Sequence, residues 1–317
     1  MRSASMVARG VVALGLLVAG CGDDDDDAAE TGTVPETTTT TTTVVETTTT
    51  TLPSAPVSAT FASAVDDSTA TQAADTMARR LDKFGYPGST SDVNADGTGL
   101  DITVVGVETT DEARTIVEEL NFRGSVLYRP VLAGPLPPTA GESPSSKTPE
   151  GLGLPPETDL TTVAGYDTPT TPPDQVSPDA DAVLADIEFG TTNVIIRWQV
   201  GPAQLDGTAT DNTQVTTSGG NNAVKVVMED TPEGLAAFNA MAEACFDRTD
   251  VCPAGAYAIQ FDGVIALVSS VRPDDASFTP FTQNDLIVSS SLWTEDEALL
   301  LAVALEAGAL PTDLIVG

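Results

Sequence analysis

Two long stretches of biased composition limit how this chain can fold. Residues 21–58 contain an acidic run and two threonine runs with few apolar side chains, and residues 133–180 are rich in Pro, Thr, Ser and Gly. Such segments bury too little apolar surface to offset the entropy that is lost on ordering. We therefore expect a disordered tether at 21–58 and a linker at 133–180, with folded modules at 59–132 and 181–317.

Residues 1–20 have the order of charged and apolar side chains that is typical of a signal peptide. Arg2 and Arg9 accompany a short apolar run, too short to span a membrane, and Cys21 follows directly. Residues 18–21, Val-Ala-Gly-Cys, resemble a lipobox, the processing motif of bacterial lipoproteins. The resemblance implies that the Cys21 thiol carries the lipid, which anchors the chain at the extracytoplasmic face of the cell membrane. The alternative is an ordinary secretory signal with an incidental cysteine.

The chain is strongly acidic and contains no histidine. It has 13 Lys and Arg against 47 Asp and Glu, a formal net charge of −34 at pH 7. A surface of that sign repels phosphate groups, which excludes nucleic acid and anionic lipid headgroups as partners. The absence of histidine excludes His-based triads and His-based metal sites. Acidity also keeps exported proteins soluble, so the charge by itself identifies no function.

The pattern at 59–132 predicts the element order β-α-β-β-α-β, which is ferredoxin-like. Apolar residues recur at helical spacing after Asp67 or Ser68, either of which can cap a helix that ends at Gly85. Thr110 is expected to cap a second helix. The strands are expected at 59–65, 92–96, 100–105 and 125–132.

The region 181–317 predicts a second α+β module. Thr231 is expected to cap a helix that has Pro232 at its first position. The Asp262-Gly263 pair predicts a two-residue turn between two strands. The strands are expected at 193–200, 222–228, 256–261, 264–270 and 286–291.

The C-terminal helix is the most specific local signal in the chain. Thr294 and Glu297 fit a capping box, and Gly308 and Pro311 end the helix. This capped helix with its Gly-Ala-Leu-Pro exit resembles the end of the first extracytoplasmic domain of SecD, the membrane-embedded accessory subunit of the bacterial protein-export machinery. In that family a transmembrane helix follows almost at once, whereas this sequence ends at Gly317. Together with Cys21, the resemblance implies a relative in which a lipid replaces the membrane helices.

Further runs resemble SecD in the same order along the chain. They are M-A-R-R-L-D-K-F-G at 77–85, G-S-V-L-Y-R-P-V-L at 124–132, G-P-A-Q-L-D-G at 201–207 and the hairpin at 256–270. The hairpin departs from the family at 268–270, where no proline stands in register. The resemblance implies an α+β fold of two ferredoxin-like or SecD-type modules, a base and a head, joined by the Pro/Thr-rich linker.

Cys245 and Cys252 are expected to form a disulfide. An even pair of cysteines in an exported chain is typical of a structural bridge. A redox-active pair is the alternative, although the C-x-x-C spacing is absent and neither a His nor a nearby Lys is available to lower a thiol pKa. The bridge would pin the end of one helix to the next strand.

No pattern in the sequence predicts a catalytic, cofactor or metal site. Residues 92–97 look like the first half of a calcium-binding EF-hand loop, but Thr103 stands where the loop needs Glu, and the segment is expected to be a hairpin. The five acids at 23–27 lack the spacing of such a loop. Motifs for nucleophilic, phosphate-binding or dinucleotide chemistry are absent from the sequence. We expect a non-enzymatic protein without cofactor.

Two functional hypotheses follow. By its resemblance to SecD, the chain is expected to bind polypeptide or to assist Sec-dependent export, with Sec translocase components or exported polypeptides as partners and the membrane reached through the lipid anchor. The second hypothesis is a structural or ligand-binding surface lipoprotein that reuses the fold without an export role. The threonine-rich tether and the acidity fit both.

Overall fold

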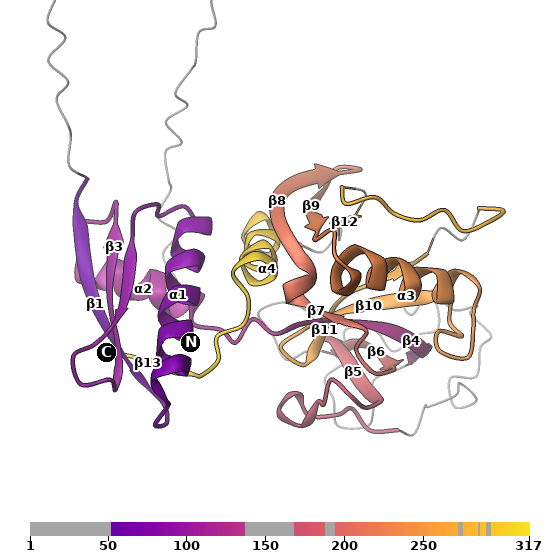
Figure 1. The fold of residues 1–317 in the computed structure, drawn as a ribbon, viewed down its shortest axis with the longest axis horizontal. Coiled ribbons are helices and arrows are strands. Elements are labelled where there is room, and N and C mark those ends of the chain that lie inside the picture. Colours follow the sequence, from indigo (N-terminus) through magenta and orange to yellow (C-terminus); the bar gives the residue numbers. More distant parts are fainter. Residues whose placement is uncertain (1–51, 137–167, 188–193, 272–274, 285, 290–292) are drawn as a thin grey trace, which may run out of the picture. The chain divides into compact units, whose positions relative to one another are not determined.

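The computed structural model describes residues 52–136, 168–187, 194–271, 275–284, 286–289 and 293–317 (Figure 1). These residues form a mixed α+β fold of three sheets and several helices. None of the described helices is long and apolar enough to cross a membrane. The expected signal peptide, Cys21 and most of the expected tether lie outside the described residues.

The first sheet is antiparallel and joins the two ends of the described chain. Its strand order is β13-β1-β3-β2, and two helices, α1 and α2, contribute to the same apolar core. Figure 1 shows both helices beside this sheet. The elements are β1 (Ser54–Phe61), α1 (Asp67–Lys83), β2 (Thr90–Val93), β3 (Gly99–Val105), α2 (Thr110–Leu120) and β13 (Leu314–Val316).

The expected last strand of the first module belongs to another sheet, so that prediction was wrong. This strand, β4 (Val126–Leu136), pairs with β6 (Val194–Val200), β7 (Leu205–Asp206) and β10 (Ala256–Phe261). β13 takes the fourth place in the first sheet. The reason lies in the burial of β4, where Tyr128, Arg129 and Val131 are completely buried. A strand with strand partners on both sides and both faces covered fits inside a closed set of strands better than at a sheet edge.

Strand β1 starts inside the expected tether, which is a second correction. Ala55, Val57 and Ala59 alternate with exposed residues and are buried in the core of the first sheet. Pro56 is tolerated because β13 pairs only with residues 59–61, which leaves this part of β1 with a partner on one side only. The short alternating run therefore forms a strand despite its polar and Pro-containing surroundings.

Five strands close into a ring. β4 pairs with β6 and β10, and the remaining pairs β10–β11, β11–β5 and β5–β6 complete the circuit, while β7 (Leu205–Asp206) pairs with β4. Val131, Leu184 and Ala258 belong to the small apolar core of this ring. The other members are β5 (Ala182–Ile187), β6 (Val194–Val200), β10 (Ala256–Phe261) and β11 (Val264–Ser270).

Part of the expected linker packs against the ring. The buried Arg129 guanidinium on β4 donates to the carbonyl of Ala180 at 3.1 Å and to the carbonyl of Ser177. Burial lowers the pKa of Arg129. The end of the segment that composition assigned to a linker is thus fastened to the strands, and it contains a short 3-10 turn at Pro173–Gln175.

The third sheet has the order β12-β9-β8 and packs with two helices on the largest apolar core. Short helical turns at Gly207–Ala209 and Pro232–Ala236 precede β8 and α3 respectively. The elements are β8 (Thr210–Ser218), β9 (Asn221–Met228), α3 (Ala237–Phe246), β12 (Leu286–Ser289) and α4 (Glu295–Ala307).

Helix α4 is buried on more than one side. Leu301 and Leu305 belong to the core of the third sheet, whereas Val303 belongs to the core of the first sheet. A helix that is apolar all round is expected where both sides are covered. The predicted capping box is confirmed, since the Thr294 and Glu297 side chains each accept from the backbone of the other.

Other local signals are confirmed or shifted by one residue. Asp262 and Gly263 form the predicted hairpin turn, with φ of 47° and 87°. The first two helices are capped one residue before the nearest expected position, by Asp66 and by Thr109. Asp66 Oδ1 accepts from the Thr69 backbone N–H at 2.7 Å. Several neighbouring residues can cap at each of these positions, and only the backbone path decides which one does.

Candidate functional site at a two-segment junction

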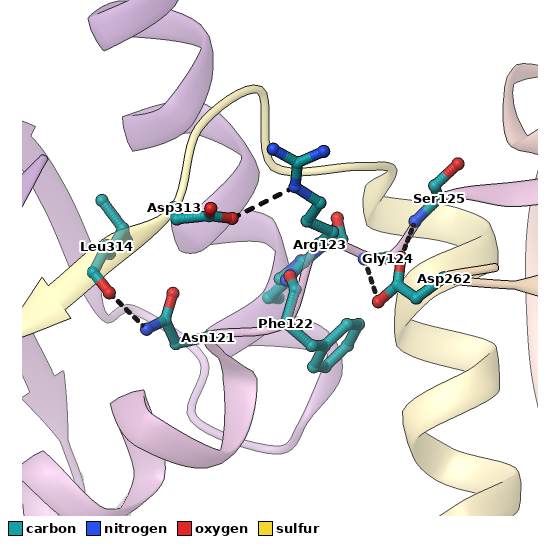
Figure 2. A network of polar contacts seen from close by, with 9 residues as sticks. Asn121, Phe122, Arg123, Gly124, Ser125, Asp262, Asp313 and Leu314 are labelled. Atoms are coloured by element: carbon teal, nitrogen blue, oxygen red, sulfur yellow. Dashed lines mark hydrogen bonds and ion pairs between the residues drawn. The ribbon is translucent and has the colours of Figure 1, made fainter. Parts of the chain in front are cut away.

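Two segments that are far apart in sequence meet between the first sheet and the rest of the fold. One leads from α2 to β4 (residues 120–125), and the other leads from α4 to β13 (residues 308–314); we call the place where they meet the junction. Leu310 N–H donates to the Arg123 carbonyl at 2.7 Å. Arg123 Nε lies 3.1 Å from Asp313 Oδ1, and Asn121 Nδ2 donates to the Leu314 carbonyl at 2.8 Å (Figure 2).

The Arg80 guanidinium ties the two segments together. It is completely buried, and its terminal nitrogens donate to four backbone carbonyls. Burial lowers the pKa of Arg80 to about 10, a change that the nearby Asp262 charge opposes, so the group stays protonated at neutral pH. The Phe122 ring lies under the guanidinium, with the ring centroid 4.2 Å from the guanidinium carbon. The accepting carbonyls are those of Leu120, Phe122, Arg123 and Gly308.

Asp262 fastens the tip of the β10–β11 hairpin to the first of these segments. Its carboxylate accepts from the backbone N–H of Gly124 at 3.0 Å and of Ser125 at 2.7 Å (Figure 2). Its own N–H donates to the Ser125 carbonyl at 2.9 Å. The neighbouring Phe261 ring packs on Phe122 with a centroid distance of 5.5 Å. The hairpin turn that the sequence predicted is therefore also a contact point of the junction.

Gly124 fits a position that no other residue would occupy without strain. Its φ is +72°, and a Cβ there would lie 2.3 Å from an Arg80 nitrogen. The left-handed backbone and the close approach of the guanidinium both favour glycine. Arg80 and Gly124 thus depend on each other, although 44 positions separate them in the chain.

A second polar contact links α1 with α4 and β8. Lys83 Nζ lies 2.5 Å from Glu306 Oε2, and the same oxygen accepts from the Thr213 N–H at 2.9 Å. Partial burial raises the pKa of Glu306, but the hydrogen bonds from Lys83 and Thr213 outweigh it and the net pKa is lowered. A hollow of about 370 Å³ lies beside this contact, lined by residues that include Arg79 and Ser89.

The contacts described at the junction are hydrogen bonds, one ion pair and ring contacts. The junction consists of backbone carbonyls and amides, the Arg80 guanidinium, the Asp262 carboxylate and the Arg123–Asp313 ion pair, and these contacts hold the two connecting segments together. Among the described residues, no group of three His, Cys, Asp or Glu side chains could bind a metal ion. In the β2–β3 turn, the Asn94 and Asp96 side-chain oxygens accept from Thr98, and Asn94 also accepts from Gly99.

The cysteines predicted to pair lie together in the structure, and the predicted lipid site is outside it. Cys245 and Cys252 are joined, with an S–S distance of 2.06 Å, and both are completely buried. The bridge connects the end of α3 to the loop before β10. Cys21 lies outside the described residues. Sequence reasoning missed Arg80, although its place among Met77, Leu81 and the other core positions of α1 was a signal that this arginine is buried.

Comparisons with known proteins identify a fold. No protein-family model matches this chain, and no curated protein matches it either. Among solved structures, a crystal structure of SecDF in a super-membrane-facing form is 15% identical, with a TM-score of 0.50, over 83% of this chain and 29% of that chain. A second SecDF structure, described as a membrane component that enhances protein export, is also 15% identical, with a TM-score of 0.49, over 83% of this chain and 97% of that chain. This chain therefore spans less than a third of the first SecDF chain, and the described residues have a SecDF-like α+β fold.

Proposed function

We propose that this chain is a lipid-anchored, extracytoplasmic SecD-like protein that binds polypeptide and assists Sec-dependent export. The observation that carries the proposal is the SecDF-like fold, which spans 83% of the chain. In this proposal the protein acts on polypeptide through non-covalent contacts. The residues of the junction hold two segments of the chain together, and none of them pairs a nucleophile with a base. In this proposal residues 21–53 serve as a tether, the first sheet with α1 and α2 serves as a base, and the elements from β4 to α4 serve as a head. The Pro/Thr-rich segment connects β4 to β5 within that head, and β13 returns to the base.

The anchor rests on the sequence around Cys21. The apolar run, the small residues at 19 and 20 and the cysteine stand in the order that lipoprotein processing requires. Globomycin, an inhibitor of the lipoprotein signal peptidase, should therefore cause the precursor to accumulate. Cys21→Ser should abolish lipid labelling while the cell still exports the chain. Normal maturation under the drug would contradict lipidation.

Exposed sheet edges are the places where an extended polypeptide can bind this fold. β2 ends the first sheet and β12 ends the third, and each presents an exposed apolar side chain, Val93 and Ile287 respectively. An extended segment can add to such an edge through backbone hydrogen bonds, with side chains giving specificity. Both edges are therefore suitable positions for a crosslinking probe.

Crosslinking in living cells tests the export role. A photo-reactive phenylalanine analogue at Ile287 or at Val93 should give adducts with exported precursors or with translocase subunits. The same analogue at Gln72, which is exposed on α1, is the matched control and should give fewer adducts. The Cys21→Ser variant should lose the adducts if the anchor brings the chain to the export site. Recovery of neither precursors nor translocase subunits at either edge would favour the surface lipoprotein without an export role.

A further inference from the structure

One surface segment contacts α3 as a bound peptide would. Residues 278–283 (Phe-Thr-Pro-Phe-Thr-Gln), here called the strap, have neither helical nor strand structure. Thr279, Pro280 and Thr282 are exposed, whereas the two phenylalanines are partly buried. The strap contacts Met228 at the end of β9 and three residues of α3, Phe238, Asn239 and Phe246. We call these four residues the α3 face.

The backbone of the strap is recognised by a single side-chain amide. Asn239 Oδ1 accepts from the Phe281 N–H at 2.7 Å, and Asn239 Nδ2 donates to the Phe281 carbonyl at 3.0 Å. This pairing of one amide with both polar groups of one residue copies a strand ladder and does not depend on the residue's side chain. A second backbone contact follows, because Met228 N–H donates to the Gln283 carbonyl at 3.1 Å.

Two aromatic rings fix the register of the strap. The Phe281 ring packs edge-on against the buried Phe238, with centroids 5.3 Å apart, and the Phe278 ring lies 5.9 Å from that of Phe246. Phe238 in turn contacts Tyr128 and Tyr257 inside the core, so the ring that receives Phe281 is rigidly supported. Aromatic anchors on a supported apolar face are the usual source of affinity at peptide-binding surfaces.

We infer that the α3 face is a binding site for an extended polypeptide segment with two aromatic side chains three residues apart, and that the strap is its intramolecular occupant. This inference rests on the proposed function, because unfolded exported chains are the clients that would displace the strap. Every polar contact of Phe281 with Asn239 uses groups that any peptide carries. A client has only to supply the two rings, at spacing i and i+3. The strap lowers the apparent affinity by the fraction of time that it covers the face.

The test uses the full mature chain and a fluorescent peptide with the sequence of residues 275–284, followed by anisotropy. Opening the face with the double substitution Phe278→Ala and Phe281→Ala should tighten peptide binding at least about 10-fold over the wild type. Adding Asn239→Ala to this double variant should return its affinity for the peptide to the wild-type value or below. Ser277→Ala, at an exposed strap-flanking position, is the matched control and should leave binding unchanged. An unrelated peptide that keeps only two phenylalanines three residues apart should compete, and its alanine version should not.

Equal affinity of the wild type and the opened variant, or no effect of Asn239→Ala, would overturn the inference. If the opened variant does not fold, as judged by circular dichroism, hydrogen exchange on the wild type decides. Saturating peptide should then speed exchange of the Phe281 amide and leave the β9 amides of Val224 and Val226 unchanged, and unaltered exchange at Phe281 would refute the site. Client adducts in cells that the double substitution does not increase would reject this site alone. Peptide binding without client adducts would reject the export role alone.

Discussion

Replacing Arg80 with methionine removes the group that holds both segments of the junction. The substitution keeps an unbranched side chain in α1 but removes the guanidinium from four carbonyls, of which that of Arg123 keeps a second donor, the Leu310 N–H. The carbonyl of Leu120 is buried, and those of Phe122, Arg123 and Gly308 are partly buried. The four acceptors therefore differ in how well water can replace the guanidinium.

The expected loss of stability follows from these exposures. A buried carbonyl without a donor costs about 1–3 kcal/mol, and the three that can regain water lose about 0.5 kcal/mol each. Loss of the contact with the Phe122 ring adds up to about 1 kcal/mol. The guanidinium no longer has to be buried, and this works in the opposite direction. We therefore expect Arg80→Met to lower the free energy of unfolding by about 3 kcal/mol. Arg80→Lys should lose about half as much, because one ammonium has only three donors.

Urea unfolding followed by circular dichroism measures this loss. Arg79→Met is the matched control, since Arg79 is the adjacent arginine on the exposed side of the same helix, and it should change the free energy of unfolding by less than about 0.5 kcal/mol. If Arg80→Met were no more destabilising than Arg79→Met, the four hydrogen bonds would make no net contribution and the reasoning about the junction would fail.

Three further predictions concern the same framework. Gly124→Ala should destabilise the fold by about 2 kcal/mol in urea unfolding, because the new methyl group meets the guanidinium and the backbone is left-handed; wild-type stability would show that the segment can shift. Reducing the bridge, or replacing Cys245 and Cys252 with serine, should cost about 2–3 kcal/mol from loop closure, and maleimide should label neither sulfur in the oxidised native protein. The stability that the Glu306 carboxylate contributes should be fully present above its ordinary pKa of 4.5 and be lost as the pH falls through its lower pKa in the folded protein. Glu306→Gln should therefore flatten this part of the plot of unfolding free energy against pH. An unchanged profile in that variant would exclude the carboxylate as the cause.

Elements with short-range signals were predictable from the sequence, and those that depend on distant partners were not. The Thr294 capping box and the Asp262 turn depend on residues within four positions of each other, so the sequence alone decides them. The polar strand β8 and the three-residue strand β13 have no such signal, because their pairing with β9 and β1 supplies what their composition lacks. The strand at 125–132 was found but placed in the wrong sheet, since its neighbours come from 182–270.

The junction could not be predicted for the same reason. Arg80 was visible as a residue on the buried stripe of its helix, but its acceptors lie 40 or more positions away. Asp262 was predicted as a turn residue, and nothing in its own surroundings indicates the pairing with the amides of Gly124 and Ser125. The cysteine pair was the exception, because two cysteines seven positions apart in a chain that is expected to be exported leave few other arrangements.

The pairing of β13 with β1 sets an order of assembly for a chain that emerges from its N-terminal end. The Thr60 side chain contacts the carbonyl of Ile315, 255 positions later, so the first sheet cannot reach four strands until residues 314–316 have been made. The ring of five strands has all its members between residues 126 and 270 and can close earlier. The helices and strands β1 to β3 of the first sheet therefore keep one edge and part of their core uncovered while the ring forms, which is when chaperones and proteases can act on them.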